Sequence, residues 1–353
     1  MEGLRSRGVA RIGYVGARRG LEREVIPRYR WIEFFPIHGR GLPRRLGWGL
    51  GLALVELLLG MVESLLIVLR FRPTLILGTG GYVSFFPLLW GVLLQVPTIV
   101  QEENVVPGLV NRLLARWADL TLVAHAETAK HLRARRIVVT GVPLRPRLLA
   151  MADREPAELR RELGLHPEKP LILVLGGSRG AAVLNQAIVQ AKEELRRDGL
   201  QVLLLSGRGV RLRVEAKAEN LVVREYLDDE EIGKALAAAD LVISRAGAGI
   251  LAELTALGKP AILVPWPDAA EAHQERNAQF LARAGGALLL PEAELKERGL
   301  NLIALSRALM ADRERLAAMA ARSRALGRRD ALNRVLEEIE RLAAERGDGQ
   351  DQG

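Results

Sequence analysis

The stretch that decides the fold runs from Asp240 to Asn277 and reads DLVISRAGAGILAELTALGKPAILVPWPDAAEAHQERN. Its apolar run at 240–244 is typical of a buried parallel strand, and helical spacing follows over 250–257 until Gly258, a common helix stop. A second strand is predicted at 261–265. The segment therefore predicts a strand–loop–helix–strand unit, whose helix N-terminus offers unpaired backbone N–H groups to a phosphate.

Polar residues suited to a sugar accompany this helix N-terminus. Glu253 lies one turn inside the helix, where its carboxylate can accept both hydroxyl protons of a ribose diol. Gln274 and Asn277 are three residues apart after the second strand, so they share a helical face and can offer amide groups to sugar hydroxyls. These residues suit a nucleotide-sugar; the alternative is an ordinary α/β unit with a solvated glutamate.

The composition is that of a globular protein. The chain has 353 residues, 49% hydrophobic and 26% charged, and this length usually forms about two domains. No cysteine is present, which excludes disulfides, cysteine-bound metal and a thiol nucleophile. The sequence has no Walker loop, no G-x-S-x-G motif and no acidic pair suited to a divalent ion, so we predict chemistry without a metal or cofactor.

Positive charge is concentrated near the N-terminus. The formal net charge is +9, and residues 1–47 contain 11 Arg against 4 Glu. Nucleic acid could attract such a segment, but only 4% of residues are aromatic, and neither a stacking platform nor a helix-turn-helix pattern occurs. We therefore predict an anionic membrane surface as the partner, and no nucleic acid.

An apolar run at 46–69 follows the basic segment and contains two glutamates, Glu56 and Glu63. The run is long enough to span a bilayer, but each glutamate would cost about 2.5–3.5 kcal/mol near the centre of a spanning helix. The glutamates are seven residues apart and share one face, as in an interfacial or packed helix. We expect a peripheral or packed helix rather than a span. Arginines flank it on both sides: Arg44, Arg45, Arg70 and Arg72.

Strands and helices alternate along both halves of the chain. Strands are predicted in the first half at 10–15, 31–36, 74–77, 98–100, 120–124 and 137–140. In the second half they are predicted at 171–175, 202–206, 221–223, 240–244, 261–265 and 287–290. This alternation predicts an α/β protein with one parallel, doubly wound sheet in each half. The segment 141–146 interrupts both periods and is the expected linker, and the polar tail at 346–353 is expected to be disordered.

Glycine loops and polar clusters follow several of the predicted strands. The loops at 78–81 and 176–180 are either tight turns or binding loops. The adjacent carboxylates Glu102 and Glu103 come at a strand end, where they are costly unless solvated or used. Ligands of such sheets bind at the carboxyl ends of the strands. We therefore expect a cleft between two α/β domains.

Together these motifs resemble the MurG family, the lipid I β-1,4-N-acetylglucosaminyltransferases of peptidoglycan synthesis. The resemblance extends from about Gly3 to about residue 335. It rests on these motifs: G-T-G-G-Y-V-S at 78–84, E-x-N at 102–104 with Asn111-Arg112, G-x-P-x-R at 141–145, G-G-S-R-G-A at 176–181 with Leu184-Asn185-Gln186, S-R-A-G-A at 244–248, and H-Q-x-x-N-A at 273–278.

The resemblance implies a GT-B fold of two Rossmann-like domains facing a cleft. The domains would be residues 1–142 and 143–329, with a C-terminal helix at about 330–345 packing back on the first. It implies an inverting enzyme that moves GlcNAc from UDP-GlcNAc to the 4-hydroxyl of MurNAc in undecaprenyl-linked lipid I, which gives lipid II. The apolar run at 46–69 resembles the family's membrane-association surface, which implies a peripheral place on the cytoplasmic face of the cell membrane.

The resemblance also implies roles for individual residues. Glu253 would bind the ribose, Gln274 the GlcNAc hydroxyls, and the Leu227 backbone the uracil. The full set implied on the donor side, including loop residues that would meet the phosphates, is Asn104, Arg145, Ser178, Leu227, Ala248, Gly249, Ile250, Glu253, Gln274 and Asn277. The set expected on the acceptor side is Gly80, Gly81, Tyr82 and Asn185.

The sequence departs from the family at its beginning. The family opens with a strand and a G-G-T-G-G-H loop, whose histidine is often assigned as the base, whereas residues 1–8 match the end of the helix after that loop. Gln101 stands where the family usually has His, and Glu103 where it usually has Gln. Loss of a buried central strand leaves unpaired backbone and a void, so we expect a truncated or misassigned start. Glu103 and Glu102 are then the acidic candidates for the general base.

Two other functions remain open. A UDP-GlcNAc 2-epimerase could use the same scaffold and would need no lipid-binding surface. A membrane-associated protein that binds a nucleotide-sugar without catalysis would also fit, because the N-terminal loop is absent.

Overall fold

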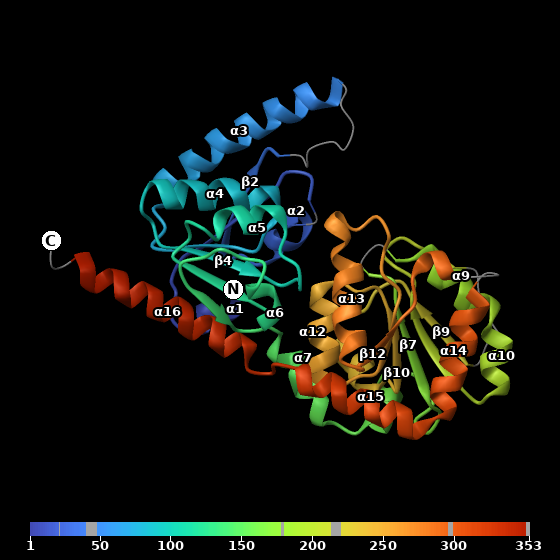
Figure 1. Cartoon of the computed structure of the whole chain (residues 1–353). Helices are drawn as coiled ribbons and strands as arrows, with labels where there is room; N and C mark the ends of the chain where they lie inside the picture. The colour runs from blue at the N-terminus through green and yellow to red at the C-terminus, as the bar shows by residue number, and fades with distance from the viewer. Residues whose placement is uncertain (21, 40–47, 178–179, 213–219, 296–298, 351–353) are drawn as a thin grey trace. The chain divides into compact units, whose positions relative to one another are not determined.

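The computed structural model describes residues 1–20, 22–39, 48–177, 180–212, 220–295 and 299–350 (Figure 1). The chain divides into two compact units: unit 1 is Met1–Pro143 with Asp330–Gly353, and unit 2 is Leu144–Arg329. Each unit is built on parallel strands connected by helices. The predicted α/β class is therefore confirmed.

Unit 1 contains the first six strands and the C-terminal helix. Its strands are β1 (Ile12–Ala17), β2 (Ile32–Ile37), β3 (Ile76–Gly78), β4 (Thr98–Glu102), β5 (Leu120–Val123) and β6 (Ile137–Val139). Its helices are α1 (Glu2–Ser6), α2 (Glu22–Val25), the 3-10 helix η1 (Ile26–Arg28), α3 (Trp48–Phe71), α4 (Gly81–Leu93), α5 (Leu109–Leu114), α6 (Ala126–Ala129) and α16 (Ala331–Gln350). The disorder predicted from residue 346 is wrong for 346–350, because α16 continues to Gln350; Arg136 pairs with Glu338 and Glu345 along it.

The strands of unit 1 form two sheets, so the single sheet predicted for this half is wrong. Among the described residues, β1 pairs only with β2, and a separate sheet has the order β3-β4-β5-β6. Helix α4 contacts both β1 and β3, although no ladder joins these two strands. A doubly wound sheet of order 3-2-1-4-5-6 has its first strand between the second and the fourth. The observed orders are those of such a sheet without this central strand.

Helices cover both faces of the four-stranded sheet. Successive residues of β4 serve opposite faces, as in any strand. Val100 packs with Leu88 of α4 on one face, whereas Ile99 packs with Val335 and Ile339 of α16 on the other. Figure 1 shows α4 and α16 on the two sides of this sheet. The carboxyl ends of the strands are thereby fixed in place by packing from both sides.

Unit 2 contains the remaining strands and the helices between them. Its strands are β7 (Leu171–Leu175), β8 (Gln201–Leu205), β9 (Leu221–Arg224), β10 (Leu241–Ser244), β11 (Ala261–Leu263) and β12 (Ala287–Leu289). Its α-helices are α7 (Pro146–Ala150), α8 (Pro156–Glu162), α9 (Ala182–Gln190), α10 (Lys192–Arg197), α11 (Asp229–Ala238), α12 (Ala248–Leu257), α13 (His273–Arg283), α14 (Leu300–Ala311) and α15 (Arg313–Leu326). Its 3-10 helices are η2 (Met151–Asp153), η3 (Ala270–Ala272) and η4 (Glu292–Glu294).

The six strands of unit 2 form one parallel sheet of order β12-β11-β10-β7-β8-β9. Leu173 of β7 packs with α11 and α12 on one face, and the next residue, Val174, packs with α9 and α14 on the other. Both faces are therefore buried, as is usual for a parallel sheet. The strand–loop–helix–strand unit predicted from 240–265 is confirmed as β10, α12 and β11.

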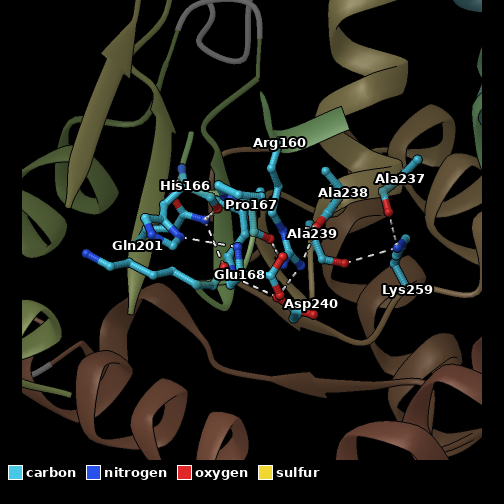
Figure 2. Close-up of polar contacts among 12 residues, drawn as sticks. Arg160, His166, Pro167, Glu168, Gln201, Ala237, Ala238, Ala239, Asp240 and Lys259 are labelled. Atoms are coloured by element: carbon cyan, nitrogen blue, oxygen red, sulfur yellow. Dashed lines mark hydrogen bonds and ion pairs between the residues drawn. The ribbon is translucent and has the colours of Figure 1, made fainter. Parts of the chain in front are cut away.

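Buried cations hold the amino ends of the strands of unit 2 (Figure 2). The Lys259 ammonium donates to the carbonyls of Ala237 (2.6 Å) and Ala239 (3.0 Å), at the end of α11. Arg160 donates to the carbonyl of the last residue of α11 and to the Asp240 carboxylate (2.8 Å). These donors satisfy carbonyls that a helix C-terminus leaves open. Burial lowers the pKa of Lys259 to about 8.

Candidate functional site

A cavity of about 920 Å³ lies at the carboxyl ends of the strands of unit 2. The ends of β7, β8 and β10 contribute Leu175, Leu205 and Ser244 to its wall, and the starts of α9, α11 and α12 contribute the rest of that side. A cavity of this size suits a ligand as large as a nucleotide-sugar. Its position is the one at which parallel α/β sheets bind ligands.

The N-terminus of α12 opens on this cavity. The helix begins directly after Gly247, its N-cap, and no side chain caps it. Gly247 and Ile250 line the cavity, and the predicted donor residues Ala248 and Gly249 lie between them in the first turn. First-turn amides have no partner within a helix, so they are available to an anion. The helix ends at Gly258, whose φ of +64° is the left-handed conformation predicted for this stop.

Glu253 lies in the cavity wall and is held there by Arg145. The Arg145 guanidinium donates to Glu253 Oε1 at 3.1 Å and also bonds the Asp229 carboxylate. The second carboxylate oxygen of Glu253 has no partner among the described residues. Burial raises the pKa of Glu253, Arg145 opposes this increase, and Asp229 adds to it. The arrangement leaves one oxygen of a positioned carboxylate free to accept a ligand hydroxyl.

Gln274 presents donors to the cavity because its oxygen is already bound. Its Oε1 accepts the backbone N–H of Trp266 at 2.9 Å and that of Ala246 at 3.3 Å. Two N–H donors on one atom identify that atom as the amide oxygen. Gln274 lines the cavity, so the groups it can offer to a ligand there are the two N–H bonds of Nε2.

The backbone just before Gln274 is strained. Glu271 and Ala272 have φ of +50° and +54°, a region that residues with a Cβ rarely adopt. Each such residue costs on the order of 1–3 kcal/mol and persists only where surrounding contacts hold it. Strain of this kind is common next to binding sites, and here it directly precedes the helix that carries Gln274.

Several predicted residues lie elsewhere. Leu227 is in the cavity wall as expected, but Asn277 and Asn185 are not. Asn277 is buried and donates to the Ala246 carbonyl at 3.2 Å, and buried Asn185 donates to the Ser206 carbonyl at 3.0 Å. These two asparagines therefore brace the loops behind the wall rather than form its surface. The predicted residue Ser178 lies outside the described residues, as do Arg44 and Arg45.

Unit 1 carries a buried carboxylate at the end of β4. Glu102 is 2% exposed, and each of its oxygens accepts two hydrogen bonds. Oε1 accepts from the backbone and side-chain N–H groups of Asn104, at 2.9 and 3.0 Å. Oε2 accepts from the Gly108 backbone at 3.0 Å and from Asn111 Nδ2 at 2.8 Å. This saturation argues against Glu102 as a general base, a role that the sequence had suggested for it.

The next carboxyl group, that of Glu103, is in a different environment. No side-chain partner for it exists among the described residues, and it is partly buried. Burial raises the pKa of Glu103, and the charge of Glu102 raises it further. The two adjacent carboxyl groups thus differ in environment: donors occupy both oxygens of Glu102, whereas the described residues provide Glu103 with no side-chain partner.

The glycine loop after β3 adjoins this network. Gly80 has a φ of +100°, and a Cβ placed on it would lie 3.1 Å from Asn111 Nδ2. Only glycine combines that conformation with so close an approach. Gly81 follows with its Cα open to solvent, and Tyr82 is partly buried with its ring beside Gly39. The predicted acceptor-side loop at 80–82 is thus adjacent to the Glu102 network.

Helix α3 turns polar groups inward and apolar groups outward. Glu63 accepts the His38 backbone N–H at 2.6 Å and pairs with His38 Nδ1 (2.8 Å) and Arg18 (2.6 Å). Burial opposes ionisation of Glu63, but the hydrogen bonds from His38 and the charge of Arg18 lower its pKa overall. The side chains that are 46–60% exposed are Leu54, Val55, Leu58, Leu59, Val62, Leu66 and Leu69, the α3 apolar face. None of the helices in the described part of the chain is long and apolar enough to cross a membrane.

Comparisons with known proteins identify the family. The family 28 glycosyltransferase models match residues 1–123 with the N-terminal domain and 171–335 with the C-terminal domain. A relative from Desulforudis audaxviator is 42% identical over 94% of this chain and 90% of that protein. It is named UDP-N-acetylglucosamine–N-acetylmuramyl-(pentapeptide) pyrophosphoryl-undecaprenol N-acetylglucosamine transferase. The chain belongs to this family. The predicted resemblance to the MurG family is confirmed.

Further comparisons agree with this membership. The relative of the same name from Moorella thermoacetica is 40% identical over 92% of this chain and 89% of that protein. The crystal structure of Acinetobacter baumannii MurG matches 96% of this chain and 93% of that chain, with a TM-score of 0.71 and 25% identity. The calicheamicin glycosyltransferase CalG4 matches with a TM-score of 0.64 at 15% identity, over 98% of this chain and 93% of that chain. The GT-B fold predicted for the MurG family is therefore confirmed.

The sequence of this MurG family member did not reveal every residue of the cavity. Asp229, which shares Arg145 with Glu253, lies in an acidic run at the start of α11 that reads as an ordinary helix N-terminus. Trp266 lines the cavity with 48% of its surface exposed. Trp266 could have been predicted in the cavity wall from its position directly after the predicted strand at 261–265, because the strand ends of such sheets face ligands.

Proposed function

We propose that this chain transfers GlcNAc from UDP-GlcNAc to the 4-hydroxyl of MurNAc in undecaprenyl-linked lipid I, which forms lipid II. The observation that carries the proposal is the cavity of unit 2, where the uncapped N-terminus of α12 and the Glu253 carboxylate share one wall. An anion site and a diol acceptor at this spacing suit a nucleoside diphosphate. Relatives named for this transfer match nearly the whole chain.

On the donor side, we assign each part of UDP-GlcNAc to a part of the cavity. The diphosphate lies against the first amides of α12, the ribose hydroxyls bind the free oxygen of Glu253, and the uracil binds the backbone of Leu227. Gln274 donates from Nε2 to a sugar oxygen. Negative charge grows on the diphosphate as the glycosidic bond breaks, and amides already aimed at it stabilise the transition state.

On the acceptor side, the reaction is a single displacement with inversion. The 4-hydroxyl oxygen of MurNAc forms a bond to the anomeric carbon while the bond from that carbon to UDP breaks. The hydroxyl proton must go to a base. We assign Glu103, because no side chain among the residues that the structure describes pairs with it and because burial and Glu102 raise its pKa. The loop at 80–82 would then face the acceptor.

A transfer assay tests this function directly. The protein is incubated with radiolabelled UDP-GlcNAc and a lipid I analogue, and labelled lipid is extracted. We expect labelled lipid II and free UDP in equal amounts. Formation of UDP-ManNAc without the acceptor would instead indicate the epimerase, and UDP-GlcNAc binding without either product would indicate a binding protein.

We further propose that the α3 apolar face lies on the cytoplasmic surface of the membrane, where it brings unit 1 to its lipid-linked acceptor. Glu63 of α3 is engaged by His38 and Arg18, and the outward leucines and valines are exposed and can enter the headgroup region. Arg70 and Arg72 at the end of the helix can contact anionic lipid.

Vesicle sedimentation tests this surface. Replacing Leu58 and Leu66 together by Gln should reduce binding to vesicles with anionic lipid by about tenfold or more, since each leucine buries apolar area. Leu300→Gln, at an exposed leucine of unit 2, serves as the control and should bind as the parent does. Equal binding of all three proteins would contradict the proposal.

A further inference from the structure

The Glu102 carboxylate joins both ends of one loop. Its donors are Asn104 at the start of the 103–108 loop, Gly108 at its end, and Asn111 in α5 just beyond. The loop is short, so fixing both ends leaves its backbone little freedom. Further contacts support it: the Thr128 hydroxyl donates to the Asn104 carbonyl at 3.1 Å. Glu103 is the first residue of this loop, so its position depends on the Glu102 network.

We propose that Glu102 is a positioning residue for transfer: its buried carboxylate folds the 103–108 loop and thereby places the Glu103 carboxyl group for proton removal from the acceptor. This inference rests on the proposed function for the identity of the proton acceptor. The folding of the loop by Glu102 does not depend on it. Glu102 itself takes no proton, because donors occupy both of its oxygens.

Glu102 acts on Glu103 in two separable ways. The first is geometric, through the four hydrogen bonds. The second is electrostatic: after burial, the charge of Glu102 is the remaining cause of the raised pKa of Glu103. Proton transfer is fastest when the pKa of the base is close to the working pH, so both effects favour Glu103 as a base.

Two variants separate these effects. Glu102→Gln removes the charge and places an NH₂ group against N–H donors, so both the loop and the electrostatic effect are lost. Asn111→Ala removes one donor (2.8 Å) but keeps the charge. Thr121→Val is the matched control: this buried residue is on β5, opposite β4, and its hydroxyl has no partner among the described residues.

The readout is the pH profile of kcat in the transfer assay. We expect kcat to fall about 10- to 100-fold in Glu102→Gln and less in Asn111→Ala, because small misplacements of a reacting group have effects of this size. We expect the acidic limb of the profile to move to lower pH in Glu102→Gln only. Thr121→Val should match the parent in both respects. An acidic limb that stays in place in Glu102→Gln, or a kcat equal to the parent's, would overturn the proposal.

Hydrogen exchange of the 103–108 loop provides a readout that needs no activity. We expect faster exchange at Asn104 and Gly108 in Glu102→Gln and Asn111→Ala than in the parent, with exchange of β7 in unit 2 unchanged. Unchanged exchange of the loop would overturn the positioning role. If the loop loosens but the parent protein transfers no GlcNAc, the proposed function fails and the structural role of Glu102 stands. If Glu103→Gln retains full kcat, the choice of proton acceptor fails.

Discussion

Unit 2 carries its cavity at the strand ends of one continuous six-stranded sheet, whereas unit 1 divides its strands between a sheet of two and a sheet of four. The chemistry at the strand ends differs as well. In unit 2 a helix N-terminus and a few side chains face a cavity. In unit 1 the saturated Glu102 carboxylate bonds both ends of a loop, and its neighbour Glu103 has no side-chain partner in the described part of the chain. Under the proposed assignments, the donor site is built mainly from backbone geometry, whereas the proton acceptor is placed and tuned by neighbouring side chains.

Hydrogen exchange offers the largest contrast between the two sheets. In a parallel sheet, alternate amides point to alternate neighbours, so β7, between β10 and β8, has all its amides paired. Among the described residues β1 and β3 have one neighbour each. We expect the outward amides of β1 and β3 to exchange about 10³-fold faster or more than those of β7, since opening a central strand costs most of the global stability. Equal protection in all three strands would show that another strand pairs with these edges in solution.

The motif spacing explains why unit 2 was predicted better than unit 1. The decisive features of unit 2 are local, so they can be recognised directly in the sequence. They are a helix stop at Gly258, a carboxylate one turn inside the helix, and amides on the next helix. The spacing of strands and helices does not give the break between β1 and β3, because strand pairing is long-range; the loss of a central strand was expected only from the family resemblance. The hydrogen bonds of Glu102 could not be predicted either, because they join positions up to nine residues apart and the sequence does not give the path of the loop between them.

The buried lysine of unit 2 gives the next largest effect. The pKa of Lys259 is about 8 in the folded protein and near 10.5 when unfolded. Between these values the unfolded chain holds the proton and the folded chain does not, so stability rises with pH, by roughly 3 kcal/mol over the whole window. Lys259→Met should abolish this rise, as measured by urea unfolding at pH 8 and pH 10.5. Lys130→Met, an exposed site in unit 1, should retain it.

If the stability of Lys259→Met still rises with pH, other groups cause the rise. The network in Figure 2 would then not distinguish unit 2 from unit 1. A rise lost equally in Lys130→Met would lead to the same conclusion.

The orientation of Gln274 predicts a smaller effect on the donor sugar. Glu at this position keeps an acceptor for the Trp266 and Ala246 amides but loses the N–H donors. We expect Gln274→Glu to weaken the binding of UDP-GlcNAc about tenfold more than the binding of UDP. This difference corresponds to the free energy of one hydrogen bond to a sugar oxygen. Calorimetry with both ligands measures the ratio. A ratio equal to the parent's would mean that Gln274 supports the loop only, as Asn277 does.

Some errors of the sequence prediction have specific physical causes. Asn277 was expected at the ligand because its amide shares a helical face with Gln274, and Asn185 because of the family resemblance, but both donate to buried loop carbonyls. An asparagine that braces a loop behind the cavity wall and one that faces a ligand have the same residue type and the same spacing in the sequence. The tail beyond residue 346 was expected to be disordered from its polarity, yet α16 continues to Gln350, with Arg136 pairing to Glu345 near this end.

The central claim is that a nucleotide-sugar lies in the cavity of unit 2 with its ribose on Glu253, and calorimetry of UDP-GlcNAc binding tests it most directly. The parent is compared with Glu253→Ala and with Glu158→Ala, an exposed carboxylate of α8 outside the cavity wall. We predict that Glu253→Ala weakens binding about 10- to 100-fold, because hydrogen bonds to a charged group are worth about 1.5–3 kcal/mol each, and that Glu158→Ala binds as the parent does. Undiminished affinity in Glu253→Ala would contradict the account.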